Sequence, residues 1–440
     1  MNAIANASRD GIRVPPTFFG HPPGLTVLFL VGMWEVFALF GLRTILVYYL
    51  VERLHFAEGD AVEVYSFSIA AALLMGLVGG VVADRLLGLR RAVGIGALLM
   101  AAGQFMIIYP SLLYCALGLS AIGNGLLKPS LVAQVSLLYE RDDPRRDRGF
   151  TVYKVACNLG GIVAPIVCGL LSISVGYGWT FGACGIGMLI SALSFAIGRK
   201  YLPEGQRREQ SVEAGPSSGD PSSTGRVMAL LALVWVSQVF FCAAYNQIGG
   251  TVALWVSQDL NRTVHLFGSS LAIPAAWFQS VNPVLILAFA PVVTAIWSRE
   301  KHSNAASDVR KIVAGTIMLA VSFFVLALAP VYGGHSPSWL WLIVALVPFT
   351  LGELYTDPIG QALFTRLAPR GLVSAFAAIW FVTQTVGYIA AGWTGSLWEH
   401  LHPAPFFGLM GVLALIGAGL AVLASPLTRM TLPPTPEAVS

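Results

Sequence analysis

Long apolar runs separated by short polar segments are the main pattern along the chain. A helix needs about 20 apolar residues to cross the hydrocarbon core of a bilayer. Twelve runs meet this criterion, and they cover residues 24–51, 62–87, 92–110, 112–139, 149–173, 177–198, 227–257, 267–298, 309–331, 338–366, 372–397 and 404–426. We therefore expect an all-α membrane protein with twelve transmembrane helices.

A long polar segment lies between the sixth and seventh runs. It reads RKYLPEGQRREQSVEAGPSSGDPSSTGR and is rich in Gly, Ser, Pro and charged residues. Segments of this composition form flexible linkers because they cannot bury enough apolar surface to fold. The pattern predicts an N-terminal six-helix bundle over 24–198, a linker over 199–226 and a C-terminal six-helix bundle over 227–426.

The basic residues predict the orientation in the membrane, because Lys and Arg gather in cytoplasmic loops. Of the 26 Lys and Arg residues, only Arg53 and Arg262 fall in the odd-numbered loops, and most of the others lie at the termini or in the even-numbered loops. We therefore expect both termini in the cytoplasm, with the protein in the inner (cytoplasmic) membrane of a bacterium.

Composition narrows the class of function. The chain is 56% hydrophobic and 11% charged, whereas about a quarter of a soluble domain is charged. Its formal charge of +4 is too small and too dispersed to indicate nucleic-acid binding. No phosphate-binding loop and no catalytic or metal-ligand motif occurs within the runs. We expect no enzyme activity, no metal and no cofactor.

The motif GGVVADRLLGLRR, at residues 79–91, marks the second cytoplasmic turn. Its small residues let two helices approach closely. Asp84 can cap or bridge a helix end, while Arg85, Arg90 and Arg91 hold the cytoplasmic side. A generic basic turn is the alternative, but the spacing G-x-x-x-D-R-x-x-G favours a gating motif of a major facilitator transporter, which also has two six-helix halves.

Six ionisable side chains fall within the predicted spans, where a charge costs about 2.5–3.5 kcal/mol on insertion scales. They are Glu35, Arg43, Lys128, Lys154, Glu353 and Asp357. Three bases and three acids balance one another, which indicates a shared polar cavity. For Arg43 and Lys154 the alternative is a place near a span end, from which the side chain extends to the interface.

The spacing of these residues predicts where they meet. Residues four apart share a helix face, and this relates Lys154 to Asn158 and Glu353 to Asp357. The charged faces come from both predicted halves. We therefore expect a substrate site between the halves, near the middle of the membrane.

Longer motifs resemble the proton-dependent oligopeptide transporter family of the major facilitator superfamily. The resemblance extends over nearly all of the spans. It is carried by GGVVADRLLGLRRAVGIGALLMAAG (79–103), GNGLLKPSL (123–131), GFTVYKVACNLGGIVAP (149–165), PAAWFQSVNP (274–283) and GELYTDPIGQALFTRLAP (352–369). It implies the major facilitator fold and transport by alternating access.

The resemblance also implies roles for single residues. Arg43 and Lys128 would hold the carboxylate of a peptide, and Glu353 its amino end. Asn158 and Asn282 would bind the peptide backbone, and Trp380 would line a side-chain pocket. A zwitterion needs one cationic and one anionic partner, and the guanidinium fork of Arg matches a carboxylate.

The chain departs from the family pattern in the first span. Typical members carry E-x-x-E-R-F-x-Y-Y-G there, whereas this chain has Glu35 without the first acid or the arginine. Asn246, a further candidate for substrate binding, replaces an acid in span 7. Lys154 replaces an aromatic residue and Asp357 a serine. The cavity is therefore expected to be rewired, and the usual route of proton coupling is in question.

Two hypotheses follow from these departures. In the first, Lys154 neutralises Glu35, with Lys128 as a competing neighbour; the alternative is that Lys154 extends to the cytoplasmic interface. In the second, Glu353 and Asp357 together carry a proton; the alternative is that Asp357 caps a helix break at Pro358.

The sequence as a whole predicts a monomeric secondary active transporter. Its expected partners are the lipid bilayer and small peptides or peptide-like zwitterions. We expect a proton gradient to drive their transport. Two alternatives stay open. The first is another kind of transporter, an exporter or uncoupled facilitator of a peptide-like metabolite. The second is a protein of another class, a membrane peptide receptor.

Overall fold

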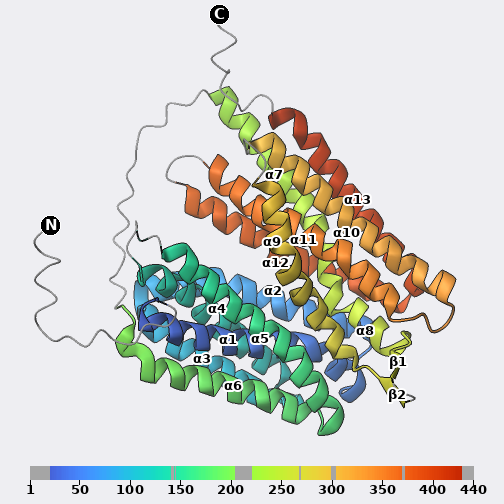
Figure 1. The fold of residues 1–440 in the computed structure, drawn as a ribbon, viewed down its shortest axis with the longest axis horizontal. Coiled ribbons are helices and arrows are strands. Elements are labelled where there is room, and N and C mark those ends of the chain that lie inside the picture. Colours follow the sequence, from blue (N-terminus) through green and yellow to red (C-terminus); the bar gives the residue numbers. More distant parts are fainter. Residues whose placement is uncertain are drawn as a thin grey trace, which may run out of the picture.

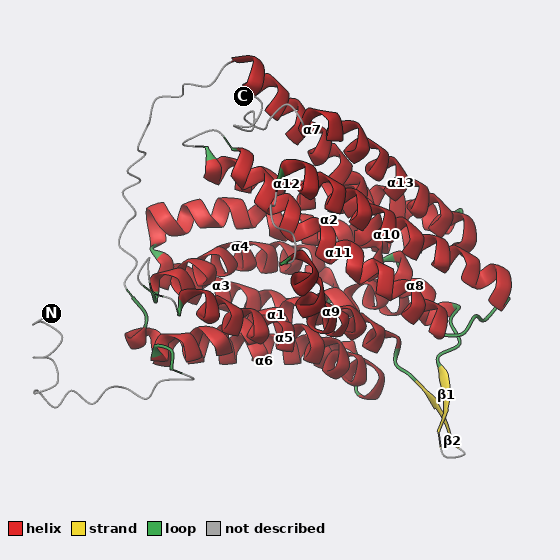
Figure 2. Ribbon diagram, turned by 45° about the horizontal axis from the view of Figure 1, so that its top comes forward, coloured by secondary structure: helices red, strands yellow, loops and turns green. Residues whose placement is uncertain are grey.

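The computed structural model describes residues 20–139, 143, 145–203, 221–266, 269–298, 304–368 and 372–428. Almost all of this part of the chain is helical (Figure 1). Its strands are β1 (Thr263–Leu266) and β2 (Ser269–Ala272), which form an antiparallel hairpin that projects from one end of the helices (Figure 2). We call this end the hairpin end.

The first six helices pack mainly against one another. They are α1 (Pro23–Tyr48), α2 (Glu58–Val82), α3 (Leu89–Met106), α4 (Leu113–Leu137), α5 (Arg146–Ser174) and α6 (Tyr177–Gly198). The following helices form a second group. They are α7 (Pro221–Tyr245), α8 (Thr251–Gln258), α9 (Val281–Trp297), α10 (Ala305–Gly333), α11 (Leu340–Leu367), α12 (Val373–Gly395) and α13 (Pro403–Thr428). We call these groups the N-half and the C-half.

The predicted linker lies mostly outside the described residues, which stop at 203 and resume at 221. Residues 221–226, which the sequence assigned to the linker, already belong to α7. The end of the molecule at which α6 stops and α7 starts is opposite the hairpin, and we call it the linker end (Figure 1). The domain boundaries at 198 and 227 stay predictions.

Ten helical segments of the described chain are long and apolar enough to cross a membrane, so the protein is an integral membrane protein. The predicted spans at 92–110 and 372–397 correspond to α3 and α12, which do not meet that criterion. Both nevertheless pack against neighbouring helices, α3 against α4 and α12 against α2. The all-α membrane fold is confirmed, and these two spans stay predicted.

Two predicted runs differ from the helices observed. The run 267–298 contains β2, and its helix starts only after Pro274, because proline disfavours helical backbone at the preceding residue. The run 227–257 is interrupted by a tight turn at Asn246–Gly249, between α7 and α8. The adjacent Gly249 and Gly250 weaken a helix there, since glycine costs about 1 kcal/mol relative to alanine.

The predicted close approach at the 79–91 motif is present. A Cβ atom built on Gly79 of α2 would lie 2.3 Å from the carbonyl oxygen of Gly125 in α4, so only glycine allows this packing. Beyond Gly79, Asp84 and Arg85 are exposed in the turn before α3, and Asp84 does not cap α3. Arg90 donates a hydrogen bond to the carbonyl oxygen of Leu202. The gating role of this motif stays a prediction.

Hydrogen bonds join the N-half to the C-half at the hairpin end. Glu58, at the start of α2, accepts hydrogen bonds from Trp398 Nε1 and Gln258 Nε2, each 2.8 Å long, and both donors belong to the C-half. The backbone N–H of Gly59 donates to Glu399 Oε1 over 3.1 Å. Burial and the nearby Glu58 raise the pKa of Asp259, which follows α8.

Toward the linker end the two halves diverge (Figure 1). Among the described residues, no hydrogen bond joins the halves at the linker end; those between the halves lie in the parts of the helices nearer the hairpin. One close contact fixes the hairpin side of the interface. A Cβ atom on Gly249 would lie 1.9 Å from the Tyr65 hydroxyl oxygen, so α2 reaches the C-half only because position 249 has no side chain.

Candidate functional site

A cavity lies between the halves, with about 1320 Å³ of space including the part that opens to solvent. Six helices and two short connecting segments supply its walls. The lining residues are Phe40, Arg43, Tyr65, Lys154, Asn158, Tyr245, Ile248, Gly249, Phe278, Gln279, Asn282, Pro283, Ile286, Leu346, Glu353, Leu354, Asp357, Pro358 and Gln361. Four charged side chains are among them: two bases from the N-half and two acids from the C-half.

Arg43 is the cation that the N-half presents from α1. Its guanidinium carbon lies 5.5 Å from the ring centroid of Phe40 and 5.4 Å from that of Tyr388, which belongs to the C-half. The Tyr65 hydroxyl lies within its hydrogen-bonding reach. Cation–π contacts hold the charge over the ring faces and leave the N–H groups at its edge able to bind a carboxylate.

Glu353 is the corresponding anion of the C-half. Asn282 Nδ2 donates to its Oε2 over 3.1 Å, and Thr350 Oγ1 donates to Asn282 Oδ1 over 2.7 Å. The Tyr245 hydroxyl is a further hydrogen-bonding neighbour. These neutral donors orient Glu353 without cancelling its charge, so the carboxylate can bind a cationic group.

Lys154 and Asp357 also face the cavity. Lys154 is exposed and forms part of the cavity wall. Asp357 accepts a 3.2 Å hydrogen bond from Trp380 Nε1. The helix α11 continues through Pro358 to Leu367, so Asp357 does not cap a break there.

Three of the residues predicted to bind substrate lie away from the cavity wall. Trp380 is 3% exposed, packs against Phe364 in the core and donates a hydrogen bond from Nε1 to Asp357. Asn246 is 3% exposed in the 3₁₀ turn after α7, and its Nδ2 has no hydrogen-bond partner among the described residues. Lys128 is exposed but does not line the cavity.

Asn158, in contrast, lines the cavity, and its amide donates to the Lys154 carbonyl oxygen over 2.9 Å.

Glu35 lies inside the N-half and is 1% exposed. Its Oε1 accepts a 3.0 Å hydrogen bond from Asn124 Nδ2, and the base that attracts it is Lys128. Lys154 instead attracts the two acids of the C-half wall, Glu353 and Asp357. Among the described residues, no ion pair joins Glu35 to Lys154, and Lys128 is the base whose charge acts on Glu35.

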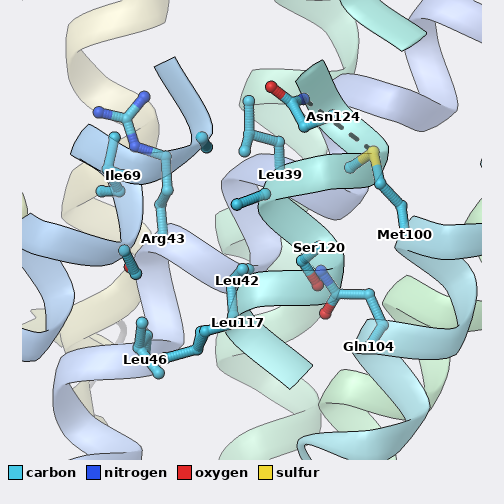
Figure 3. Close-up of a pocket in the computed structure, with 13 residues that line it drawn as sticks. Leu39, Leu42, Arg43, Leu46, Ile69, Met100, Gln104, Leu117, Ser120 and Asn124 are labelled. Carbon is cyan, nitrogen blue, oxygen red and sulfur yellow. Dashed lines mark hydrogen bonds between the residues drawn. The ribbon is translucent and has the colours of Figure 1, made fainter. Parts of the chain in front are cut away.

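A polar stripe on α4 explains the position of Glu35. Ser120, Asn124 and Lys128 are four residues apart and share one helix face. Figure 3 shows Ser120 and Asn124 beside a small pocket of the N-half, with Gln104 of α3 close to Ser120. Asn124 also contacts Met100 Sδ at 4.0 Å (Figure 3). In the sequence, Asn124 precedes Lys128 by four residues. This spacing could have identified Asn124 as a polar neighbour on the same helix face.

This position of Glu35 gives a testable energetic coupling. The effects of Glu35→Gln and Lys128→Ala on the free energy of unfolding of the purified protein are expected to be non-additive. The double-mutant cycle should give a coupling energy of about 0.5–3 kcal/mol. The reason is that loss of Lys128 leaves a buried carboxylate without its cation, whereas the double variant has no charge to compensate.

The matched control is the cycle of Glu35→Gln with Lys154→Ala, which should be additive within about 0.5 kcal/mol. A larger coupling of Glu35 to Lys154 than to Lys128 would restore the pairing first expected from the sequence.

Sequence reasoning missed the tyrosines that surround the charges. Tyr65 and Tyr245 line the cavity, and Tyr388 covers Arg43. A tyrosine in an apolar span combines a buried ring with a polar tip that usually finds a partner. This signal is too general to single out these three without the positions of the helices.

Two bundles around a cavity with opposite charges on its two walls define a membrane transporter of the major facilitator type. The POT family model matches residues 90–215 and 220–404, so the chain belongs to this family of transporters.

Full-length relatives support the assignment. The chain is 27% identical to the di-/tripeptide transporter of Lactococcus lactis subsp. cremoris, over 95% of this chain and 98% of that protein. It is 29% identical to the peptide transporter YePEPT of Yersinia enterocolitica subsp. palearctica, over 94% and 96%. It is 28% identical to the uncharacterized transporter YclF of Bacillus subtilis, over 94% and 95%.

Solved structures agree with the fold. The structure of a peptide transporter POT in complex with sulfate is 25% identical, with a TM-score of 0.85 over 94% of this chain and 97% of that one. A variant of such a transporter in complex with alafosfalin is 27% identical, with a TM-score of 0.83 over the same shares of the two chains.

Proposed function

We propose that the protein transports small peptides or peptide-like zwitterions by alternating access. The observation that carries this proposal is the placement of Arg43 and Glu353 on opposite halves of one cavity. Arg43 would bind the carboxylate of the substrate and Glu353 its amino group. A substrate bound in this way contacts both halves at once, which is what couples binding to their relative movement. Relatives named as di-/tripeptide transporters support the substrate class.

The remaining polar groups of the wall suit an amide backbone. Asn158 and Gln279 line the cavity from the N-half and the C-half, and side-chain amides both donate and accept hydrogen bonds. Asn282 is already bonded to Glu353 and Thr350, so we assign it the role of positioning Glu353.

Transport in proteoliposomes tests the proposal. Purified protein should accumulate a labelled dipeptide when an inward proton gradient is imposed, and excess unlabelled peptide should suppress the signal. Accumulation only under an outward gradient would identify an exporter, and equilibration without accumulation an uncoupled facilitator. Saturable binding without any flux would identify a receptor and contradict the proposal.

We further propose that Glu353 and Asp357 carry the coupled proton, because Asn246 stands where the family pattern has an acid. Two carboxylates one helical turn apart in a cavity favour protonation of one of them through mutual repulsion. Asp357→Asn should abolish pH-driven accumulation while leaving the dissociation constant for peptide within about threefold. Undiminished accumulation by this variant would rule out the role of Asp357.

The remaining assignments are proposals about context. The basic residues support a cytoplasmic location of the linker end, and hence of both termini, in a bacterial inner membrane. With that orientation the cavity opens to the cytoplasm. We propose a monomer embedded in lipid that moves its substrate without chemical change; size-exclusion chromatography with light scattering tests the oligomeric state.

A further inference from the structure

A second pair of opposite charges lies closer to the linker end than the proposed substrate contacts. Lys154 precedes Asn158 by one turn of α5, a helix that begins at the linker end. Asp357 follows Glu353 by one turn of α11, a helix that ends there. A substrate that leaves the cavity through the linker end therefore passes between Lys154 of one half and Asp357 of the other.

The two side chains differ in their hydrogen-bond partners. Asp357 is fixed by the hydrogen bond from Trp380 Nε1, whose ring is buried in the core. Among the described residues, the ammonium group of Lys154 has neither a hydrogen bond nor an ion pair, although its attraction reaches both Asp357 and Glu353 across the cavity. A cation on a flexible four-carbon stem therefore faces a fixed anion on the opposite half.

Closure of the linker end imposes a charge balance. A closed cavity excludes bulk water, and an unpaired charge in such a space is costly. When neither acid carries the coupled proton, a zwitterionic substrate compensates Arg43 with its carboxylate and Glu353 with its amino group. Lys154 and Asp357 are then left over, with opposite signs and on opposite halves, and each can compensate the other.

We propose that Lys154 and Asp357 form an ion pair across the linker end of the cavity when that end closes, and separate when it opens. The inference rests on the proposed function for alternating access but not on the identity of the substrate. It also limits the substrate class: the transported molecule needs one charge of each sign, and its side chains can be neutral.

The two ends of the protein differ in the contacts that join the halves. The hairpin end is held shut by hydrogen bonds that Glu58 accepts from the C-half. When that end opens, the linker end needs contacts between the halves in its place. In the described part of the chain, Lys154 and Asp357 are the oppositely charged pair that faces across the cavity nearest that end.

Charge exchange tests the pair in a substrate counterflow assay, which needs no proton gradient and so does not depend on proton coupling at Asp357. Lys154→Asp and Asp357→Lys should each slow counterflow of a neutral dipeptide about tenfold, and the double variant should recover to within about threefold of wild type. Lys154→Gln combined with Asp357→Asn should also be milder than either single change. Lys200→Asp, on an exposed lysine that does not line the cavity, is the matched control.

The same assay distinguishes the pair from a role in binding substrate side chains. If Lys154 bound an acidic side chain, Lys154→Asp would reduce counterflow of a Glu-containing dipeptide far more than that of a neutral one, and the double variant would not recover. Either result would overturn the proposal.

A distance measurement tests the pair without any substrate. Spin labels at Leu137, at the end of α4, and Leu372, just before α12, are on exposed positions 47% and 49% accessible. With the exposed Cys115 replaced, the wild-type protein should show a population with a short distance between labels, and Lys154→Ala should reduce it. An unchanged distribution would refute the ion pair, even if peptide transport were confirmed. Conversely, a reduced population supports the pair even if the substrate proves not to be a peptide.

Discussion

Arg43→Ala is expected to weaken binding of a zwitterionic peptide by about 1.5–3 kcal/mol, or roughly 10- to 150-fold in the dissociation constant. The guanidinium is the base that the N-half presents beside the aromatic rings of Phe40 and Tyr388, and no carboxylate of the described protein forms an ion pair with it. Alanine removes the charge and both stacking contacts. Isothermal titration calorimetry on the purified variant measures the loss.

Two controls separate carboxylate binding from a general defect. Arg53→Ala removes an arginine that does not line the cavity and should leave affinity unchanged. A peptide with a C-terminal amide should bind wild type weakly and should lose little further affinity in Arg43→Ala. Equal binding of the amide and the free acid to wild type would contradict the assignment of Arg43.

Glu58→Ala is expected to shift the protein from the conformation closed at the hairpin end toward one open there, by about tenfold in the ratio of populations. The variant loses the acceptor of hydrogen bonds from Trp398 and Gln258 across the halves. Hydrogen bonds to charged groups contribute about 1.5–3 kcal/mol each, and exposure to solvent lowers that value. Labels on the hairpin ends of α2 and α13 would report the change as a longer distance.

A matched glutamate exists at the same end. Glu52 accepts a hydrogen bond from Tyr177, which belongs to its own half. Glu52→Ala removes a similar interaction without touching the contact between halves, so its distance distribution should match wild type. If both variants shifted equally, the effect would be one of surface charge and not of the contacts made by Glu58.

The spans were predictable because hydropathy reports directly on transfer into lipid. The site was predictable in part for a related reason. Charges inside spans are costly enough to mark function, and this identified Arg43, Lys154, Glu353 and Asp357, all of which line the cavity.

The partners of those charges were not predictable, because spacing along one helix says nothing about which neighbouring helix it faces. Glu35 is bonded to Asn124 of α4, whereas Lys154 of α5 faces across the cavity to α11. Trp380 was expected at a pocket wall but is buried in the core, where its N–H group donates to Asp357. Likewise, the apolar residues of the hairpin were predicted to belong to a transmembrane span. The helical segment begins only after Pro274.

The contact between Gly249 and Tyr65 has a practical consequence for capturing other states of the transporter. Any side chain at position 249 would collide with the Tyr65 ring whenever the hairpin end is shut, but would meet no such obstacle once α2 and the C-half move apart. Gly249→Ala would therefore favour the conformation that is open at the hairpin end. This variant would help to capture that conformation in crystals or on cryo-EM grids. Pairing it with Tyr65→Phe, which deletes the colliding oxygen, would supply a graded series of traps.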